Sequence, residues 1–165
     1  MFHTSPEAMA YSLGKSLLMV HRFVDDLKPE EFAAQPFPGC NSIAWILGHL
    51  VNVDRRQLGW LGAEVLPPLP EWFREEAFKT TRTTAAEQEN LGDGKELIAL
   101  FDAHRKMLIQ ILPTVDAAKF AEAPTMQSPL FADRGEATLF MGLHTALHMG
   151  QITLMRRALG YPPVN

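Results

Sequence analysis

Apolar residues recur at three- and four-residue spacing in four separate segments of this chain, and this pattern restricts its fold more than any other feature. Such spacing lines one face of an α-helix with apolar side chains. No segment shows the alternation of apolar and polar residues that is typical of a half-buried strand. We therefore predict an all-α fold.

Turn and capping signals set the bounds of the helices. Ser5 is a candidate N-cap for the first helix and Asn41 or Ser42 for the second, and Gly160 has the conformational freedom that the end of the last helix requires. The predicted helices run from about Pro6 to Leu27, from residue 43 to Leu61, from residue 95 to Leu112, and from Arg134 to Leu159. Four amphipathic helices of this length predict a four-helix bundle.

Two long connections interrupt a simple succession of helical hairpins. Residues 62–93 form a connection longer than most helix-to-helix loops, and residues 113–133 contain three prolines. We expect a long crossover between the second and third helices, in which Trp72, Phe73 and Phe78 form a short helix over one end of the bundle. The sequence leaves open whether this segment is a structural crossover or a lid over a substrate.

Size, charge and cysteine content limit the classes of function. The 165 residues fit a single domain, 1–165, large enough to bury a core without a disulfide. The formal charge of −4 argues against binding nucleic acid, which requires clustered cations. No apolar run is long enough to span a membrane and no secretory signal is evident, so we expect a cytoplasmic protein that binds no membrane. Cys40, the only cysteine, is expected to be a small, at least half-buried loop residue rather than a nucleophile.

The last predicted helix carries two histidines one turn apart. The spacing His144-x-x-x-His148 puts both imidazoles on one helix face, near enough to bind one metal ion together. Met141, Ile152 and Met155 lie at helical spacing from them, so the face is expected to point toward the core. Buried imidazoles need hydrogen-bond partners or a shared ligand.

Two further residues, Thr145 and His49, indicate which kind of metal site this is. A zinc protease of the H-E-x-x-H type has Glu as its general base, whereas position 145 is Thr, so a metalloprotease is disfavoured. His49 lies between Ile46 and Leu50 on the inward stripe of the second helix. Three histidines from two facing helices predict a metal tripod with an open coordination position, as in catalytic zinc sites.

The remaining histidines have less specific positions. His104 follows the inward stripe of the third helix and fits an ordinary core histidine best, with a fourth ligand or a substrate-contacting group as alternatives. His21 and His3 are expected at the boundary or surface. Gln151 and Asn52 each lie three residues beyond a candidate ligand, where each could orient an imidazole or serve only in helix packing.

Two segments carry a resemblance to a known family. The sequence SIAWILGHLVNVD around His49, together with HTALHMGQI around His144 and His148, resembles the DinB-like (YfiT-type) family of bacterial four-helix-bundle proteins. The resemblance implies a divalent metal ion, most often nickel or zinc, held by these three histidines, and a bundle that forms homodimers. It also implies an activity on a small molecule, since relatives include S-transferases that use glutathione, mycothiol or bacillithiol, and a maleylpyruvate isomerase.

Three hypotheses of function follow. In the first, the protein is a metal-dependent transferase or hydrolase, with a low-molecular-weight thiol or water at the open position. In the second, it is a binding or stress-response module that carries the fold and the metal without catalysing a reaction. In the third, the histidines are only polar groups of the core, and no metal binds.

Overall fold

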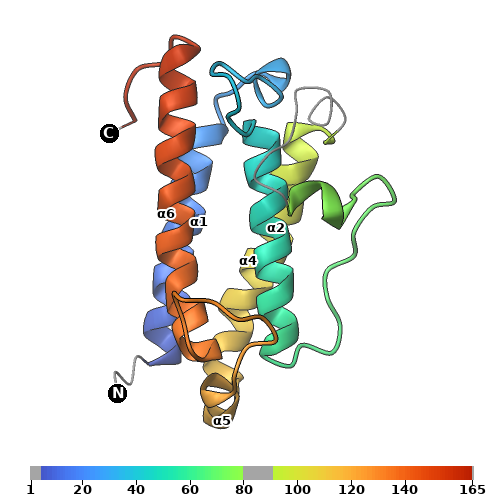
Figure 1. Ribbon diagram of the computed structural model, residues 1–165, viewed down its shortest axis with the longest axis vertical. Coiled ribbons are helices and arrows are strands. Elements are labelled where there is room, and N and C mark those ends of the chain that lie inside the picture. The colour runs from blue at the N-terminus through green and yellow to red at the C-terminus, as the bar shows by residue number, and fades with distance from the viewer. Residues whose placement is uncertain (1–4, 80–90, 165) are drawn as a thin grey trace.

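The computed structural model describes residues 5–79 and 91–164, and the described part of the chain is helical, without strands (Figure 1). Four long helices form the bundle: α1 (Pro6–Val24), α2 (Ile43–Trp60), α4 (Gly94–Ile111) and α6 (Arg134–Ala158). Shorter elements connect them: η1 (Pro29–Glu31), η2 (Glu75–Phe78), η3 (Leu112–Thr114) and α5 (Ala117–Ala121). The predicted all-α bundle is confirmed.

The capping signals act as the sequence predicts. The Ser5 side chain accepts a hydrogen bond from the Ala8 amide at 3.2 Å, and Ser42 accepts one from the Trp45 amide at 3.1 Å. Gly160 has a φ of +91°, which an L side chain rarely adopts. Each cap pairs a backbone group that a helix end would otherwise leave without a partner.

The first helix ends earlier than predicted, at Val24 instead of Leu27. Lys28 precedes Pro29 and has an extended backbone, with φ −77° and ψ 152°. The proline ring disfavours a helical conformation for the residue before it, so the helix has to end before Lys28. It ends already at Val24 because the Leu27 amide donates to the carbonyl of Val24 in a tight turn, and not to that of Phe23 as an α-helix would require.

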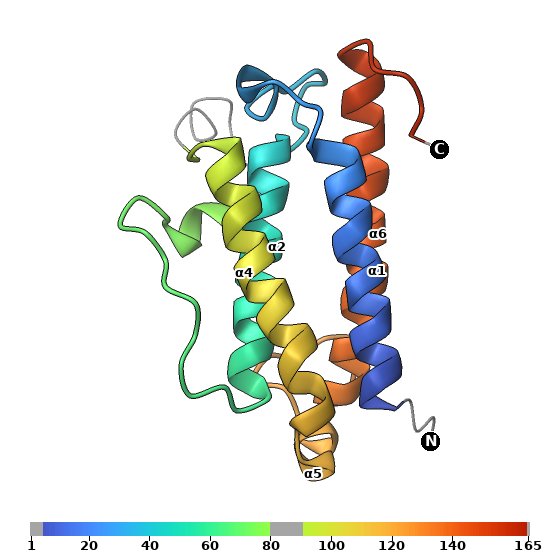
Figure 2. The ribbon, with the colours of Figure 1, turned by 180° about the vertical axis from the view of Figure 1, so that it is seen from behind.

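The long helices run up, down, down and up in chain order (Figures 1 and 2). Because α2 and α4 are parallel neighbours, the chain has to return along the length of the bundle between them. The predicted long crossover between the second and third of these helices is therefore a consequence of the topology. The segment 80–90, a polar part of this connection, lies outside the described residues.

The described part of the crossover packs against the side of α2, not over an end of the bundle as predicted (Figure 1). Within its described residues, only Glu75–Phe78 is helical, and Trp72 and Phe73 precede it. The buried ring of Phe78 rests on Gly48 near the middle of α2, and Phe73 stacks on Phe78 with ring centroids 4.7 Å apart. A glycine at position 48 leaves the space that this contact needs, so the crossover is fixed beside α2.

The second connection contains an element that the sequence did not predict. Asp116 accepts a hydrogen bond from the Ala118 amide at 2.9 Å and caps α5, which consists of only five residues. A helix this short has no periodic stripe that could be recognised. No helix in the described ranges is long and apolar enough to cross a membrane.

The centre of the bundle contains a buried ion pair that joins the long helices. Arg105 of α4 donates to both carboxylate oxygens of Asp54 on α2, at 2.7 and 2.8 Å, and both side chains are fully buried. The same guanidinium donates to Ser16 of α1 at 2.6 Å and to Thr145 of α6 at 3.3 Å. One charged group thus hydrogen-bonds to three other helices, which limits how they can slide against one another.

Candidate metal centre

Two neighbouring helices bring the three predicted ligands together. His49 extends from α2, while His144 and His148 extend from α6, and all three side chains are partly buried. The buried stripe of α6 is offset from the predicted one, because Thr145 and Met149 occupy it instead of the two histidines. The histidines of α6 therefore lie at the edge of the core, where the space between α2 and α6 opens to solvent.

The three Nε2 atoms of this cluster converge. His144 Nε2 lies 3.3 Å from His49 Nε2 and 3.1 Å from His148 Nε2. One ligand nitrogen from each of the three residues lies within 4.8 Å of the other two, so the three side chains could hold one metal ion. The hydrogen-bond partners on the far side of the rings show why Nε2 faces inward.

Two of the rings have their tautomer fixed by a partner. His49 Nδ1 lies 3.0 Å from the carbonyl oxygen of Phe78, and His148 Nδ1 lies 2.9 Å from Oε1 of Gln151. Because both oxygens can only accept, each Nδ1 donates its hydrogen. In a neutral ring the opposite nitrogen, Nε2, then carries a lone pair. A single hydrogen on His144 Nε2 cannot satisfy both lone pairs well, whereas a metal cation would.

The spacing of the nitrogens fits a first-row divalent ion. Two nitrogens that each lie about 2.0–2.1 Å from a zinc ion are roughly 2.8–3.4 Å apart for octahedral or tetrahedral angles. The measured separations of 3.1 and 3.3 Å fall in this range. Three imidazoles suit zinc, nickel, copper and iron alike, so the donor set fits a metal without selecting one.

Burial keeps the rings neutral at physiological pH. It lowers the pKa of His49 to about 4, although the hydrogen bond to Phe78 opposes the change. Burial, together with the neighbouring histidines and the charges of Arg105 and Arg56, lowers the pKa of His144 to about 3. The pKa of His148 is also lowered by burial. Neutral imidazole is the form that binds metal ions, so protons do not compete near pH 7.

A pocket of about 380 Å³ opens onto all three histidines. Trp45, four residues before His49 on α2, stacks on the His49 ring with centroids 4.9 Å apart and planes within 8° of parallel. This histidine pocket is completed by the loop between α1 and α2 and by residues of α6: Phe37, Gly39, Cys40, Asn41, Gln151, Leu154 and Met155. A small molecule with an apolar part could therefore reach the cluster from solvent.

Three other residues considered in the sequence, His104, Gln151 and Asn52, differ in how they relate to the cluster. His104 is buried away from the cluster, with Nδ1 donating to the Leu100 carbonyl at 2.8 Å and Nε2 accepting from Arg55 at 3.3 Å, as expected of a core histidine. Gln151 orients His148, as one prediction had it. Asn52 does not contact His49 and donates to the Glu75 carbonyl at 2.8 Å instead.

Three further outcomes concern residues outside the cluster. His21 is half-buried at the boundary between core and surface, as predicted, yet it also forms an unforeseen link from α1 to α4, with Nε2 2.7 Å from a carboxylate oxygen of Asp102. Cys40 is half-buried in its loop, as expected. His3 lies outside the described residues.

The sequence did not reveal three residues that support the cluster. Trp45 and Arg56 are four and seven positions from His49, so their place on the same side of α2 could have been inferred from helical spacing. The Phe78 carbonyl could not, because no property of its side chain predicts where the crossover places its backbone.

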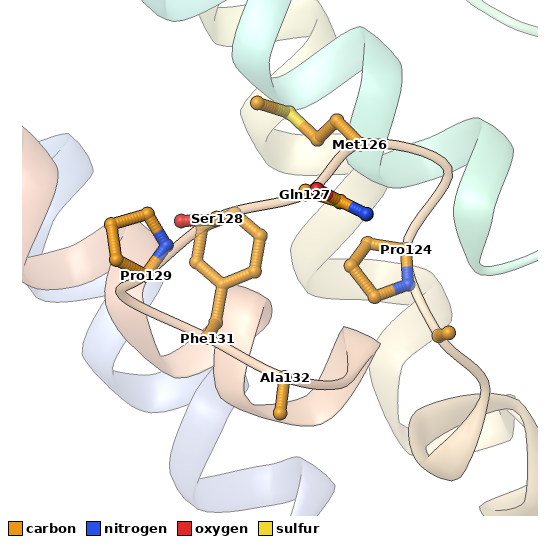
Figure 3. A pocket seen from close by; sticks show the side chains of 8 residues that line it. Pro124, Met126, Gln127, Ser128, Pro129, Phe131 and Ala132 are labelled. Carbon is orange, nitrogen blue, oxygen red and sulfur yellow. The ribbon is translucent and has the colours of Figure 1, made fainter.

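A second pocket, of about 510 Å³, lies within the loop between α5 and α6 (Figure 3). Its lining comes from residues 123–132, including Pro124, Met126 and Phe131, and contains no charged side chain. None of the three histidines lines it. Of these two pockets, the histidine pocket is the one lined by groups that can bind a metal.

One protein family matches most of the chain. The model of the DinB superfamily matches residues 15–152, a range that contains all three histidines and most of the four long helices. No curated protein matches the chain.

Proposed function

Because the chain belongs to the DinB superfamily, we propose that it is a metal-dependent enzyme acting on a small molecule, of the thiol S-transferase or hydrolase type. His49, His144 and His148 would hold one divalent ion, zinc or nickel, as neutral imidazoles. The observation that carries the proposal is the convergence of three Nε2 atoms beside a pocket open to solvent. Three ligands leave coordination positions free, as catalytic metal sites require.

The chemistry of such a site is simple. A divalent ion on three neutral ligands keeps its positive charge and lowers the pKa of a water or thiol that joins it, which makes either one nucleophilic near pH 7. The residues around the three histidines would orient the ligand nitrogens for that step. The Phe78 carbonyl and Gln151 fix the direction of two imidazoles, and Trp45 covers one face of the His49 ring.

The pocket also favours a substrate with an apolar part. Phe37, Trp45, Leu154 and Met155 give the histidine pocket an apolar lining beside the ligand nitrogens. These side chains would exclude water from part of a bound molecule and strengthen electrostatic interactions at the cluster. The thiol or water nucleophile and the second substrate would meet at this face.

Elemental analysis and a thiol panel test the proposal together. The purified protein is expected to contain about one equivalent of a divalent metal per chain. The metal-loaded protein should then transfer at least one of glutathione, mycothiol or bacillithiol to an electrophile such as chlorodinitrobenzene, or hydrolyse an activated ester. His144→Gln should abolish both metal content and activity, while His104→Gln, which changes a histidine outside the cluster, should retain the metal.

The test separates the proposal from its two alternatives. A metal-loaded protein that is inert with every thiol and ester would support a non-catalytic metal-binding or stress-response module instead. A protein that takes up no metal even after incubation with zinc and nickel would refute the metal site. In that case the three imidazoles would be polar groups at the edge of the core and nothing more.

We also propose that two copies of the chain form a homodimer through α6. Four leucines on this helix are at least 39% exposed and follow one another at spacings of four, four and seven: Leu139, Leu143, Leu147 and Leu154. Exposed apolar stripes of this kind mark interaction surfaces on soluble domains. Leu154 also lines the histidine pocket, so a partner seated on this stripe would lie beside the entrance.

A further inference from the structure

One guanidinium near the histidine cluster has no carboxylate partner within the described ranges. Arg56 is exposed on α2, seven residues after His49, and its guanidinium lies over the ring of Trp60, 5.3 Å from the centroid. None of the ion pairs in the described part of the chain includes it. An arginine next to a cavity with no counterion is suited to bind an anion.

The cavity beside Arg56 has a volume of about 440 Å³ and also has His49 in its lining. We call it the arginine pocket, and it is lined by His49, Asn52, Val53, Arg55, Arg56, Glu75, Phe78 and Lys79. His49 therefore contributes to both the arginine pocket and the histidine pocket. A molecule bound at the cluster needs only to extend past this ring to reach Arg56.

The charges of the arginine pocket leave one cation unpaired. Arg55 pairs with Glu75 at 3.7 Å and also donates to the Pro67 carbonyl at 2.8 Å. Lys79 pairs with Glu76 at 2.5 Å. With these two cations engaged, Arg56 supplies a surplus of one positive charge. A group with a single negative charge matches this surplus, whereas a phosphate dianion would leave Glu75 facing excess negative charge.

A row of aromatic rings from α2, the loop before α6 and α6 itself leads from Arg56 toward the cluster. The Trp60 ring contacts Phe131 with centroids 6.4 Å apart, Phe131 contacts Phe140 at 6.0 Å, and Phe140 contacts His144 at 5.9 Å. These rings make the region between the guanidinium and a ligand histidine apolar. A ligand with an apolar body and a charged end matches the apolar lining of the histidine pocket and the guanidinium of the arginine pocket together.

We propose that the substrate of this protein carries a carboxylate, and that Arg56 binds it through its guanidinium. The inference rests on the proposed function, because it places the rest of the substrate at the histidine cluster. It assigns Arg56 to recognition of the substrate and gives it no part in bond making or breaking.

A binding experiment that needs no turnover tests this assignment. The probes are 3-phenylpropionate and 3-phenylpropan-1-ol, which share an apolar body and differ in the carboxylate, together with inorganic phosphate. Binding is followed by NMR through the indole N–H signals of the tryptophans, among them Trp60 beside Arg56. Each titration is carried out on the metal-loaded protein and again after treatment with a chelator.

We expect the wild-type protein to bind the carboxylate about tenfold more tightly than the alcohol, since a charge-assisted hydrogen bond is lost with the alcohol. Arg56→Gln should remove this preference, and Arg56→Lys should retain part of it because the charge remains. Arg157→Gln, which removes an exposed arginine near the end of α6, is the matched control and should retain the full preference.

Three results would overturn the proposal: equal binding of both probes by the wild type, an unchanged preference in Arg56→Gln, or tighter binding of phosphate than of 3-phenylpropionate. The state of the metal is a separate outcome. A protein that takes up no metal but prefers the carboxylate through Arg56 would refute the proposed function and leave the anion site in place.

Discussion

Gln151 and His148 lie three residues apart on α6, and the hydrogen bond between them decides which nitrogen of His148 faces the cluster. Gln151 accepts from Nδ1 at 2.9 Å, which leaves Nε2 free to bind an ion. His49 is oriented in the same way, because its Nδ1 donates to the backbone carbonyl of Phe78. Partners of this kind hold the ring orientation and the basicity of metal-binding histidines.

Removing the Gln151 side chain should therefore weaken the metal site without removing a ligand. We expect Gln151→Ala to lower the affinity for zinc by about tenfold or more, as is typical for the loss of such a partner. Competition with a chromogenic chelator measures the affinity. Gln110→Ala, a change at an exposed glutamine of α4, is the control and should leave the affinity as it is. Equal affinities in all three proteins would show that Gln151 has no role in orienting His148.

His21 links two helices through two carboxylates. Its Nδ1 lies 2.9 Å from Asp25 and its Nε2 2.7 Å from Asp102. Burial lowers the pKa of His21, but the hydrogen bonds and charges of Asp25 and Asp102 outweigh it, so the pKa is raised above its ordinary value. The protonated ring can donate to both carboxylates at once, which the neutral ring cannot.

This raised pKa predicts a loss of stability at alkaline pH. A group with a pKa raised by folding stabilises the folded state fully below its unfolded pKa, about 6.5, and the contribution is lost as pH rises through the folded pKa. We expect the free energy of unfolding, measured by urea denaturation between pH 6 and pH 9, to fall by up to about 1 kcal/mol from this source. His21→Gln should flatten this part of the profile, and an equally steep profile in the variant would assign the loss to other groups.

At the scale of elements, Gly48 of α2 couples the crossover to the candidate metal centre. A Cβ at position 48 would lie 2.2 Å from a ring carbon of Phe78, well inside van der Waals contact. The Phe78 ring is buried and stacks on Phe73, so it cannot turn away without moving the backbone. That backbone supplies the carbonyl that His49 Nδ1 donates to.

Gly48→Ala is therefore expected to affect both stability and metal binding. Overpacking of this kind costs about 1–3 kcal/mol of unfolding free energy, and the displaced Phe78 carbonyl should weaken zinc binding as well. Gly59→Ala on the same helix is the matched control, because its Cβ would meet nothing within 4 Å. That variant should be as stable as the wild type or up to about 1 kcal/mol more stable. Thermal denaturation measures the stability of both variants, and zinc titration measures their affinity for the metal. Equal stability and equal affinity of the two variants would contradict this expectation.

Local patterns predicted the helices because their signals lie within a few residues of one another. The stripe of α1 and the caps Ser5 and Ser42 act at short range, and the structure reproduces them. The segments around His49 and His144 predicted three candidate ligands, and the fold brings these side chains together. The position of the crossover depends on how Phe78 meets Gly48, thirty residues away in sequence, which no local pattern encodes.

At the scale of the whole molecule, the buried Asp54–Arg105 pair and the exposed surface have different consequences. The pair holds the long helices in one register, since removing either partner would leave an unpaired charge in the core. The sequence could not reveal it, because charged residues are normally predicted at the surface. The buried ion pair therefore fixes the positions of the long helices, while the exposed apolar side chains of α6 remain accessible to a partner.

The leucine stripe of α6 gives the proposed homodimer a direct test. In a two-fold symmetric dimer the same surface of both copies meets, so a charge introduced on the stripe lies close to its own copy, and the like charges repel. We expect the wild-type protein to sediment as a dimer and Leu143→Glu as a monomer. Leu130→Glu is matched in exposure, with 61% for Leu130 against 58% for Leu143, but it lies in the loop before α6 and should remain dimeric. Analytical ultracentrifugation over a range of concentrations measures the outcome, and a wild-type protein that remains monomeric throughout would show that the stripe does not bind a second copy.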